Sequence, residues 1–243
     1  MVKLKKNIFK LFISLIISIF SYAAFADDIT EVYRAAMDTP ESIKAAGGFY
    51  PRGMDGSRPN QPPPDINLWN HVHGADTGMS RHNSGYVSTT TSRGLAIRWV
   101  NDHLNHNGYV YRIRATPNFI DVNASLRHYS PHSEELEVSA LGVIHWNQVI
   151  GWERVRGGRV GSFVHNPDYR ERLYTSFSSS GAQPQLAAFP NNHPAWAEQP
   201  WVNFANCELK SSCSPIKSTQ KLGEEWFLKS YYDILNILVT IID

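Results

Sequence analysis

Hydrophobic and polar residues alternate along several short stretches of the chain, which is the pattern of half-buried β-strands. The clearest alternation lies in Tyr109–Ala115. Weaker alternation or β-branched enrichment predicts further strands at residues 30–34, 86–91, 138–150 and 150–155. Residues 92–104 instead carry apolar side chains spaced along one face of a helix. Because the strands are not regularly interleaved with helices, the pattern predicts an α+β fold rather than a doubly wound α/β sheet.

Capping residues mark a second helix, which is predicted over Asp38–Ala46. Thr39 is a favoured N-cap, Pro40 suits the first turn, and Gly47 is placed to end the helix. Shorter helical signals lie at residues 66–71 and 218–232. Glycine, proline and polar residues predict loops over residues 50–65, 74–85 and 156–200.

The first 26 residues have the features of an export signal. Four lysines precede an apolar core, Leu11–Phe20, which is short for a membrane span. Ala24-Phe25-Ala26 then supplies a cleavage sequence of the A-x-A type. We therefore predict a signal peptide at residues 1–26 and a secreted protein, with an uncleaved membrane anchor as the alternative.

Charge argues against nucleic acid as a partner. Removing the signal deletes four lysines and no acidic residue, so the formal net charge falls from +1 to −3. A mature chain that is not basic lacks the electrostatic attraction that nucleic-acid binding requires. Trp196 and Trp201 are accordingly expected to be packing anchors rather than platforms for stacked bases.

The two cysteines, Cys207 and Cys213, are expected to form one small disulfide loop, because an exported protein meets an oxidising environment. Closing so short a loop restricts the unfolded chain only modestly. Such a bridge is better suited to holding two pieces together after a cut. Lys210 lies inside the loop and is a plausible site for a trypsin-like protease.

Glu135 and Glu137 form an acidic pair just before an apolar run. If this segment is extended, alternation places both carboxylates on one face, with Leu136 pointing the other way. Two neighbouring acids raise each other's pKa, so the arrangement adds no stability. A carboxylate pair suits the cleavage of a glycosidic bond, in which an oxocarbenium ion must be stabilised. The alternative is a solvated acidic turn before a strand.

Other motifs do not support a metal site or a Rossmann dinucleotide fold. His71 and His73, and likewise His103 and His106, have ligand-like spacing, but no H-E-x-x-H pattern accompanies them. The glycines at 157, 158 and 161 form neither a dinucleotide fingerprint nor a phosphate loop. We therefore expect no bound metal.

Short motifs spread in order over nearly the whole exported chain carry a family resemblance. They are Val32–Arg34, Ala45–Gly48, Pro51–Gly53, Ile66–Leu68, His71, Thr77–Gly78, Arg81–His82, Gly85–Thr89, Ala115–Asn118, Asp121–Asn123, Tyr129–His132, Glu135, Glu137–Gly142, Gly151–Trp152, Arg154–Val155, Ala188–Pro190, Pro194–Trp196, Glu198 and Pro200–Trp201. With these motifs the chain resembles the enzymatic A subunits of cholera toxin and the heat-labile enterotoxins, ADP-ribosylating toxins that have a pentameric B partner. The resemblance implies an ADP-ribosyltransferase toxin fold, with mixed or antiparallel sheets and short helices, followed by a C-terminal helix and tail.

The resemblance assigns roles to the candidate site residues. Glu137 matches the acid that stabilises the oxocarbenium ion as nicotinamide leaves NAD, and Glu135 matches the acid associated with transfer to arginine. Ser88 matches the serine that holds the catalytic glutamate. His71 is implied to position the substrate, with a packing or capping role as the alternative. The residues implied to bind NAD, which is a substrate, are Arg34, Ala35, Ser88 and Arg81.

One departure from the family concerns the residues after Arg34. The family follows this arginine with Ala-Asp-Ser, whereas this chain has Ala35-Ala36-Met37. The missing aspartate helps to hold the arginine in the family, so a changed network or weaker NAD binding is expected. Asp38 is displaced by two residues and is not expected to substitute for it.

The resemblance also implies the domains and partners. We expect an ADP-ribosyltransferase domain at residues 27–206, a disulfide-closed nicking loop at 207–213, and a helix and tail at 214–243 that links to the B pentamer. The implied acceptor is an arginine of the stimulatory G-protein α subunit, whose modification raises cAMP, with host ADP-ribosylation factor as activator. The alternatives are a transferase with another acceptor, an enzyme that is mainly an NAD glycohydrolase, and a degenerate subunit that serves only in toxin assembly.

Overall fold

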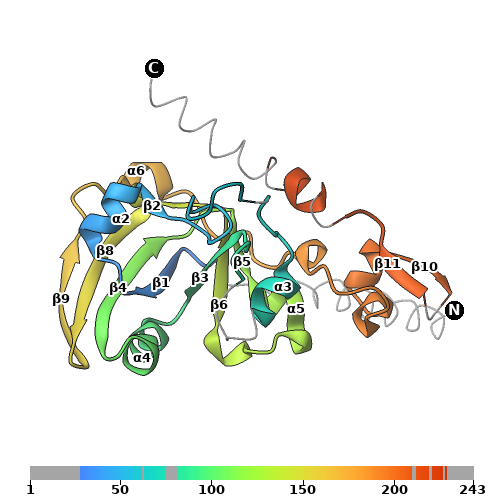
Figure 1. Cartoon of the computed structure of the whole chain (residues 1–243), viewed down its shortest axis with the longest axis horizontal. Coiled ribbons are helices and arrows are strands. Elements are labelled where there is room, and N and C mark those ends of the chain that lie inside the picture. The colour runs from blue at the N-terminus through green and yellow to red at the C-terminus, as the bar shows by residue number, and fades with distance from the viewer. Residues whose placement is uncertain are drawn as a thin grey trace, which may run out of the picture.

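The computed structural model describes residues 28–61, 63–74, 81–209, 212–218, 221–226 and 228, and it has the predicted α+β character (Figure 1). The strands are β1 (Glu31–Ala36), β2 (Gly48–Phe49), β3 (Tyr86–Thr90), β4 (Asn107–Arg114), β5 (Phe119–Asp121), β6 (Glu137–Leu141), β7 (Ile144–His145), β8 (Val149–Arg156), β9 (Arg159–His165), β10 (Ala205–Leu209) and β11 (Ser212–Pro215). The α-helices are α2 (Pro40–Ala46), α3 (Leu68–His73), α4 (Arg93–His103), α5 (Val122–Leu126) and α6 (Glu171–Tyr174). Short 3₁₀ turns are η1 (Arg127–Tyr129), η2 (Ser133–Glu135), η3 (Trp146–Gln148), η4 (Pro184–Leu186), η5 (Pro194–Ala197) and η6 (Trp201–Phe204).

The main sheet has seven antiparallel strands in the order β5-β6-β3-β1-β4-β8-β9. Its pairing is uneven. β1 and β4 are paired at six positions, whereas β1 and β3 are paired only where Tyr33 faces Thr90. The sheet is therefore divided into a β5-β6-β3 part and a β1-β4-β8-β9 part, which are paired at one position (Figure 1).

The predicted helix at residues 38–46 is confirmed as α2, with its caps. The Thr39 hydroxyl accepts a hydrogen bond from the Ser42 amide at 3.3 Å, and Gly47 ends the helix in the left-handed conformation with φ 85°. The helix predicted at 92–104 is confirmed as α4, with Ser92 as N-cap. One or two strands are predicted over residues 138–150, and the structure has two, β6 and β7, because Gly142 turns the chain at φ 83° between them.

The prediction of a loop over residues 156–200 is wrong in part, because this region contains β9 and α6. β8 and β9 form a hairpin, and its turn is Gly157-Gly158, with φ 55° and 76°. Two consecutive positive φ values are typical of the turn that matches the twist of a two-residue hairpin. β9 is exposed along almost its whole length, so it lacks the alternation of a half-buried strand. β5 and α5 were also not predicted.

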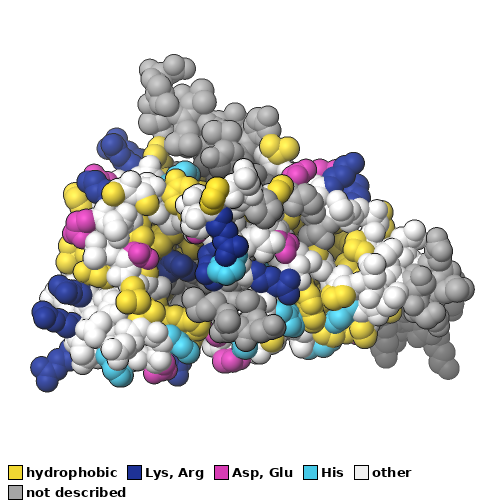
Figure 2. Space-filling view, in the orientation of Figure 1, with side chains coloured by type: hydrophobic (Ala, Val, Ile, Leu, Met, Phe, Trp, Pro, Cys, Tyr) yellow, Lys and Arg dark blue, Asp and Glu magenta, His cyan; other side chains and the backbone are white. Residues whose placement is uncertain are grey.

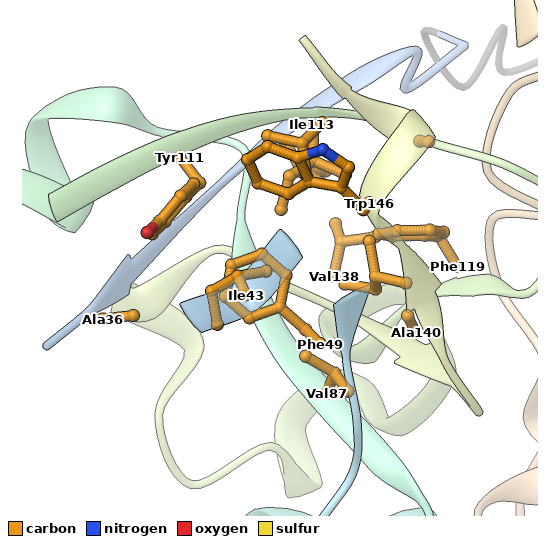
Figure 3. Close-up of a cluster of buried hydrophobic side chains, with 14 residues drawn as sticks. Ala36, Ile43, Phe49, Val87, Tyr111, Ile113, Phe119, Val138, Ala140 and Trp146 are labelled. Carbon is orange, nitrogen blue, oxygen red and sulfur yellow. The ribbon is translucent and has the colours of Figure 1, made fainter. Parts of the chain in front are cut away.

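Hydrophobic packing forms three clusters around the sheet. The first covers one face and includes Val32, Phe49, Tyr111 and Trp146 (Figure 3). The second joins α3, α5 and β6 to the region of η4–η6, and it contains Trp196 and Trp201, which are 2% and 0% exposed. Both tryptophans are therefore packing anchors, as predicted. A third, smaller cluster lies between α4 and strands β4 and β8.

The C-terminal region begins with a hairpin. β10 and β11 are paired, and the predicted disulfide between Cys207 and Cys213 is present. Residues 221–226 are helical, in agreement with the predicted C-terminal helix. The predicted signal peptide, Lys210 and the tail beyond residue 228 lie outside the described residues. Within the described ranges, no helix combines the length and apolar character needed to cross a bilayer.

Candidate active site

Four elements bring a polar cluster together inside the β5-β6-β3 part of the sheet. Glu137 begins β6, and Ser139 follows two residues later on the same face of that strand. Ser88 lies directly opposite Ser139 in the β3–β6 register. His71 is supplied by α3, whose Leu68 is buried in the second hydrophobic cluster and so fixes the helix against the sheet. Packing of α3 therefore holds His71 over the two strands.

His71 is the centre of this cluster. Its Nε2 atom lies 3.1 Å from Glu137 Oε1, 3.0 Å from Ser139 Oγ and 3.2 Å from Ser88 Oγ. Its Nδ1 atom lies 2.9 Å from Ser84 Oγ. The His71 side chain is 2% exposed and that of Glu137 is 12% exposed. The structure thus joins three predicted site residues, Glu137, His71 and Ser88, through direct contacts.

Glu137 is surrounded by groups that favour its ionised form. Burial alone would raise the pKa of this carboxyl group. The electrostatic attraction of His71 and its hydrogen bond, together with hydrogen bonds from Ser139 and Ser88, outweigh burial and hold the pKa of Glu137 below its usual value. The Ser139 hydroxyl donates to Glu137 Oε1 at 2.7 Å. Glu137 is therefore a carboxylate that is largely removed from water yet remains charged.

The side chain of Arg34 extends from β1 to β3, the two strands at which the parts of the sheet meet. Its Nη1 donates to the Ser88 carbonyl oxygen at 2.6 Å, and its guanidinium carbon lies 5.4 Å from the centre of the Phe49 ring. Burial lowers the pKa of Arg34, while Asp38 and Glu137 act in the opposite direction. The network that holds Arg34 thus uses a backbone carbonyl and an aromatic ring, and Asp38 acts only through its charge.

One donor of Arg34 is left over. The Arg34 Nε atom is buried and has no hydrogen-bond partner within the described part of the chain. A buried guanidinium donor without a partner is costly, and an anionic oxygen of a bound molecule would satisfy it. This donor fits a dinucleotide diphosphate, which is the anionic part of NAD.

Glu135 occupies a different backbone setting from the one predicted. The segment is not extended, because Glu135 ends the 3₁₀ turn η2 and Leu136 adopts the left-handed conformation with φ 49° and ψ 45°. The turn is attached to β3, since the Thr90 hydroxyl donates to the Glu135 carbonyl oxygen at 2.8 Å. Burial and the charge of Glu137 raise the pKa of Glu135, while His132 and His103 act against the rise. The two carboxylates therefore sense each other but have opposite tendencies to ionise.

The two remaining residues predicted to bind NAD lie outside the His71 contacts. Arg81 is exposed and donates from Nε to the Gly74 carbonyl oxygen at 2.9 Å. Ala35 pairs with Val110 in the sheet, and its side chain packs against the third hydrophobic cluster. Within the described part of the chain, neither Arg81 nor Ala35 forms a hydrogen bond or ion pair with Glu137.

Ser139 and Ser84 are two further members of the His71 cluster that were not predicted as site residues. Alternation from Glu137 would have placed Ser139 on the same strand face, so a signal for Ser139 was available. Ser84 lies before β3 and contacts His71 from a loop, and no local pattern marks such a contact. Among the described residues, no group of three or more His, Cys, Asp or Glu side chains is arranged to hold a metal ion.

Comparison with known proteins adds a family match. A family model described as heat-labile enterotoxin alpha chain matches residues 5–231. Heat-labile enterotoxin IIB, A chain, of Escherichia coli is 40% identical over 210 residues, which are 84% of this chain and 77% of that protein. NAD(+)--arginine ADP-ribosyltransferase Chelt of Vibrio cholerae is 42% identical over 178 residues, 71% of this chain and 30% of that protein. A solved structure of a heat-labile enterotoxin double mutant has a TM-score of 0.72 at 32% identity, covering 87% of this chain and 96% of that one.

Proposed function

Because this chain belongs to the heat-labile enterotoxin alpha chain family of ADP-ribosyltransferase toxins, we propose that it transfers ADP-ribose from NAD to an arginine side chain of a host protein. The observation that carries the proposal is the buried carboxylate of Glu137, which is kept ionised by contacts with His71, Ser139 and Ser88. The arginine acceptor is supported by the relative that is named as an NAD–arginine ADP-ribosyltransferase.

In the first step the bond between the nicotinamide nitrogen and the ribose C1′ breaks. The bonding electrons leave with nicotinamide, which becomes neutral, and the ribose is left as an oxocarbenium ion. The Glu137 side chain is largely buried, and in such surroundings its negative charge stabilises that cation strongly. We assign Glu137 this role, with His71 and Ser88 holding its carboxylate in place.

The diphosphate of NAD requires cationic groups, and we assign this role first to Arg34. Its buried, unpartnered Nε supplies a donor that a phosphate oxygen would accept. Lys and Arg side chains also gather near the centre of the molecular face, with a histidine among them (Figure 2). The charges of Arg58 and Arg52 lower the pKa of His82, so these three side chains lie near one another. Arg81 is proposed to contribute to the same region, and Ala35 to contribute through its backbone.

In the second step the acceptor nitrogen bonds to C1′ and a proton must leave the guanidinium. An arginine guanidinium is cationic at neutral pH and is a poor nucleophile. We assign Glu135 the task of orienting the guanidinium and accepting the proton. The raised pKa of Glu135 suits this task, because a stronger base accepts the proton more readily.

The proposal extends to delivery and assembly. Residues 1–26 would be removed during export, and residues 27–206 would form the catalytic domain. A cut within the disulfide loop at 207–213 would separate this domain from residues 214–243, which would link to a pentamer of B subunits. The stimulatory G-protein α subunit is the proposed acceptor, with a rise in cAMP as the result and ADP-ribosylation factor as the proposed activator. The A-chain names of the relatives support the partnership with B subunits.

The test uses labelled NAD and agmatine, a small guanidinium acceptor, with the nicked and reduced protein. Wild-type protein is expected to label agmatine and release nicotinamide. Glu137→Gln should lose both activities by about a thousandfold, the scale found when an electrostatic stabiliser of a transition state is removed. Glu135→Gln should keep nicotinamide release while losing agmatine labelling.

The matched control is Glu134→Gln, which removes an exposed carboxylate from the same turn. It should leave both activities unchanged. Nicotinamide release without agmatine labelling in the wild type would favour an NAD glycohydrolase. No release at all would reject catalysis and favour an assembly subunit.

A further inference from the structure

The Ser84 hydroxyl is buried on the far side of His71 from Glu137. Ser84 is 3% exposed, and its Oγ lies 2.9 Å from His71 Nδ1. Its backbone is fixed on two sides, because the Gly53 amide donates to its carbonyl oxygen at 2.8 Å and its own amide donates to the Arg81 carbonyl oxygen at 3.0 Å. A Cβ atom on Gly53 would lie 2.8 Å from that Ser84 oxygen, so only glycine permits this approach.

The neighbours of His71 Nε2 require that this nitrogen carries a proton. One neighbour is the carboxylate of Glu137, which can only accept. The other two are the hydroxyl oxygens of Ser139 and Ser88, whose protons are directed to Glu137. Both hydroxyl hydrogens point to the carboxylate, and the carboxylate itself carries none. Nε2 therefore faces only oxygen lone pairs and is the donor.

The opposite holds at Nδ1. Ser84 Oγ already accepts a hydrogen bond from the Tyr86 amide at 3.3 Å. Its own proton is therefore available to point at His71 Nδ1, which then acts as the acceptor. A neutral imidazole with its proton on Nε2 satisfies every one of these contacts at once. The reverse tautomer would require Ser84 Oγ to accept a second hydrogen bond and would leave Nε2 without a proton to offer Glu137.

We propose that Ser84 is a positioning residue that holds His71 in the neutral Nε2–H tautomer, so that Glu137 keeps its full negative charge toward the ribose of NAD. An imidazolium at this position would offset the negative charge of the Glu137 carboxylate, and that charge is what stabilises the oxocarbenium ion. A neutral imidazole instead orients Glu137 by a hydrogen bond without cancelling its charge. This inference rests on the proposed function of Glu137.

The charged and titratable groups around His71 are few. Glu137 faces Nε2 from β6, and the ring of Tyr86 lies 5.0 Å from the imidazole, centroid to centroid, from β3. Burial and the charge of Asp65 raise the pKa of Tyr86, so the phenol stays neutral. Arg34 and Glu135 interact with Glu137 rather than with the imidazole directly. Ser84 is thus the hydrogen-bond partner at Nδ1, where its proton favours an unprotonated nitrogen, while Glu137 at Nε2 favours a protonated one.

The first test is NMR of the full mature chain with ¹⁵N-labelled histidine, which distinguishes the two tautomers and the imidazolium by their ring nitrogen shifts. The His71 signals are assigned by their loss in His71→Asn. At the pH of activity, we expect a protonated Nε2 and an unprotonated Nδ1. A proton on Nδ1, alone or together with Nε2, would overturn the proposal. This measurement needs no substrate, so it stands apart from the test of the proposed function.

Substitutions at Ser84 give the second test. Ser84→Ala should produce a mixture of tautomers and lower the rate of nicotinamide release by roughly tenfold or more, because the catalytic geometry is no longer held. Ser84→Thr keeps the hydroxyl and should retain the Nε2–H signal. Ser84→Asp should favour the imidazolium and move the acid limb of the pH–rate profile to higher pH.

The matched control is Ser125→Ala, which removes another fully buried hydroxyl that is bonded to the backbone of Asp121 and Gln183. It is expected to lower stability while leaving the His71 signals unchanged. An unchanged tautomer population in folded Ser84→Ala would contradict the role of Ser84. If the wild type cleaves no NAD but shows the Nε2–H tautomer, the proposed function fails and the tautomer assignment survives.

Discussion

The two glutamates of the site differ because their surroundings differ. Glu137 has three hydrogen-bonding neighbours that stabilise its charge, and its pKa is lowered even though burial acts to raise it. Glu135 has no comparable set of donors in its 3₁₀ turn, so burial and the repulsion from Glu137 prevail and its pKa is raised. Environment thus separates two identical side chains into a persistent anion and a base.

This difference predicts that the two activities depend differently on pH. As pH falls, a carboxylate with a raised pKa takes up its proton first, and one with a lowered pKa takes it up last. Under the proposed roles, agmatine labelling needs ionised Glu135, whereas nicotinamide release needs only ionised Glu137. We therefore expect labelling to be lost at a higher pH than nicotinamide release when both are measured on the same samples across a pH series.

A control for this prediction is Glu135→Gln, whose remaining nicotinamide release should follow the wild-type release curve. Coincident curves for labelling and release in the wild type would show that Glu135 does not limit transfer.

Single residues also show how far the sequence alone could reach. Motif matching nominated Glu137, His71 and Ser88, and the structure brings these three side chains together. The sequence could not reveal Ser84, because the contact between Ser84 and His71 depends on how the loop before β3 packs against α3. Alternation along the sequence predicted an extended segment at Glu135, since this pattern takes no account of the left-handed backbone at Leu136.

At the scale of elements, the single paired position between β1 and β3 explains how the sheet can contain a site. Full pairing would place the two strands side by side and leave no room for Arg34 to reach the Ser88 carbonyl. The sequence predicted both strands but contains no signal for the number of pairs between them. Elements with strong caps or alternation, such as α2 and β4, were predicted well. β9 was missed because its exposed residues carry no such pattern.

The turn between β8 and β9 allows a stability prediction at this scale. A Cβ on Gly157 would meet no atom within 4 Å, so a substitution there acts only through the positive φ of 55°. Gly157→Ala should lower the free energy of unfolding by ~1 kcal/mol, the cost of the left-handed conformation for an ordinary residue. Urea unfolding measures the loss, and NAD cleavage should be unchanged because the hairpin is at the sheet edge.

Gly157→Asn is the matched variant, since asparagine tolerates the left-handed conformation better than alanine does. It should lose less stability than Gly157→Ala. An equal loss in the two variants would mean that the backbone conformation of the turn is not the cause.

At the scale of the whole molecule, the second hydrophobic cluster joins segments that are far apart in the chain. It contains Leu68 of α3, Trp201 of η6 and Cys213 of β11, and Trp226 packs against it. The sequence identified the tryptophan anchors but not their partners, because these contacts depend on the path of the long region after β9. The segment after Cys213 is therefore attached to the preceding part of the chain by packing as well as by the disulfide.

This attachment predicts that cutting the disulfide loop and reducing the bridge do not by themselves separate the pieces. After such a cut, β11 still pairs with β10, and the helix at residues 221–226 still rests on Ile66. A site-specific protease sequence placed between Cys207 and Cys213 permits a single cut. The cut and reduced pieces should elute together in native size-exclusion chromatography and run apart on a denaturing gel.

Gly223 provides the variant that tests the packing, because a Cβ at this position would lie 2.0 Å from Ile66 Cδ1. Gly223→Ala should push the helix away from Ile66 and let the reduced pieces elute separately, whereas Lys221→Ala, at an exposed position of the same helix, should leave them together. Separation of the reduced wild-type pieces without denaturant would show that the disulfide alone joins them. Retained association instead means that release of the catalytic part requires the second cluster to open, so reduction is necessary but not sufficient.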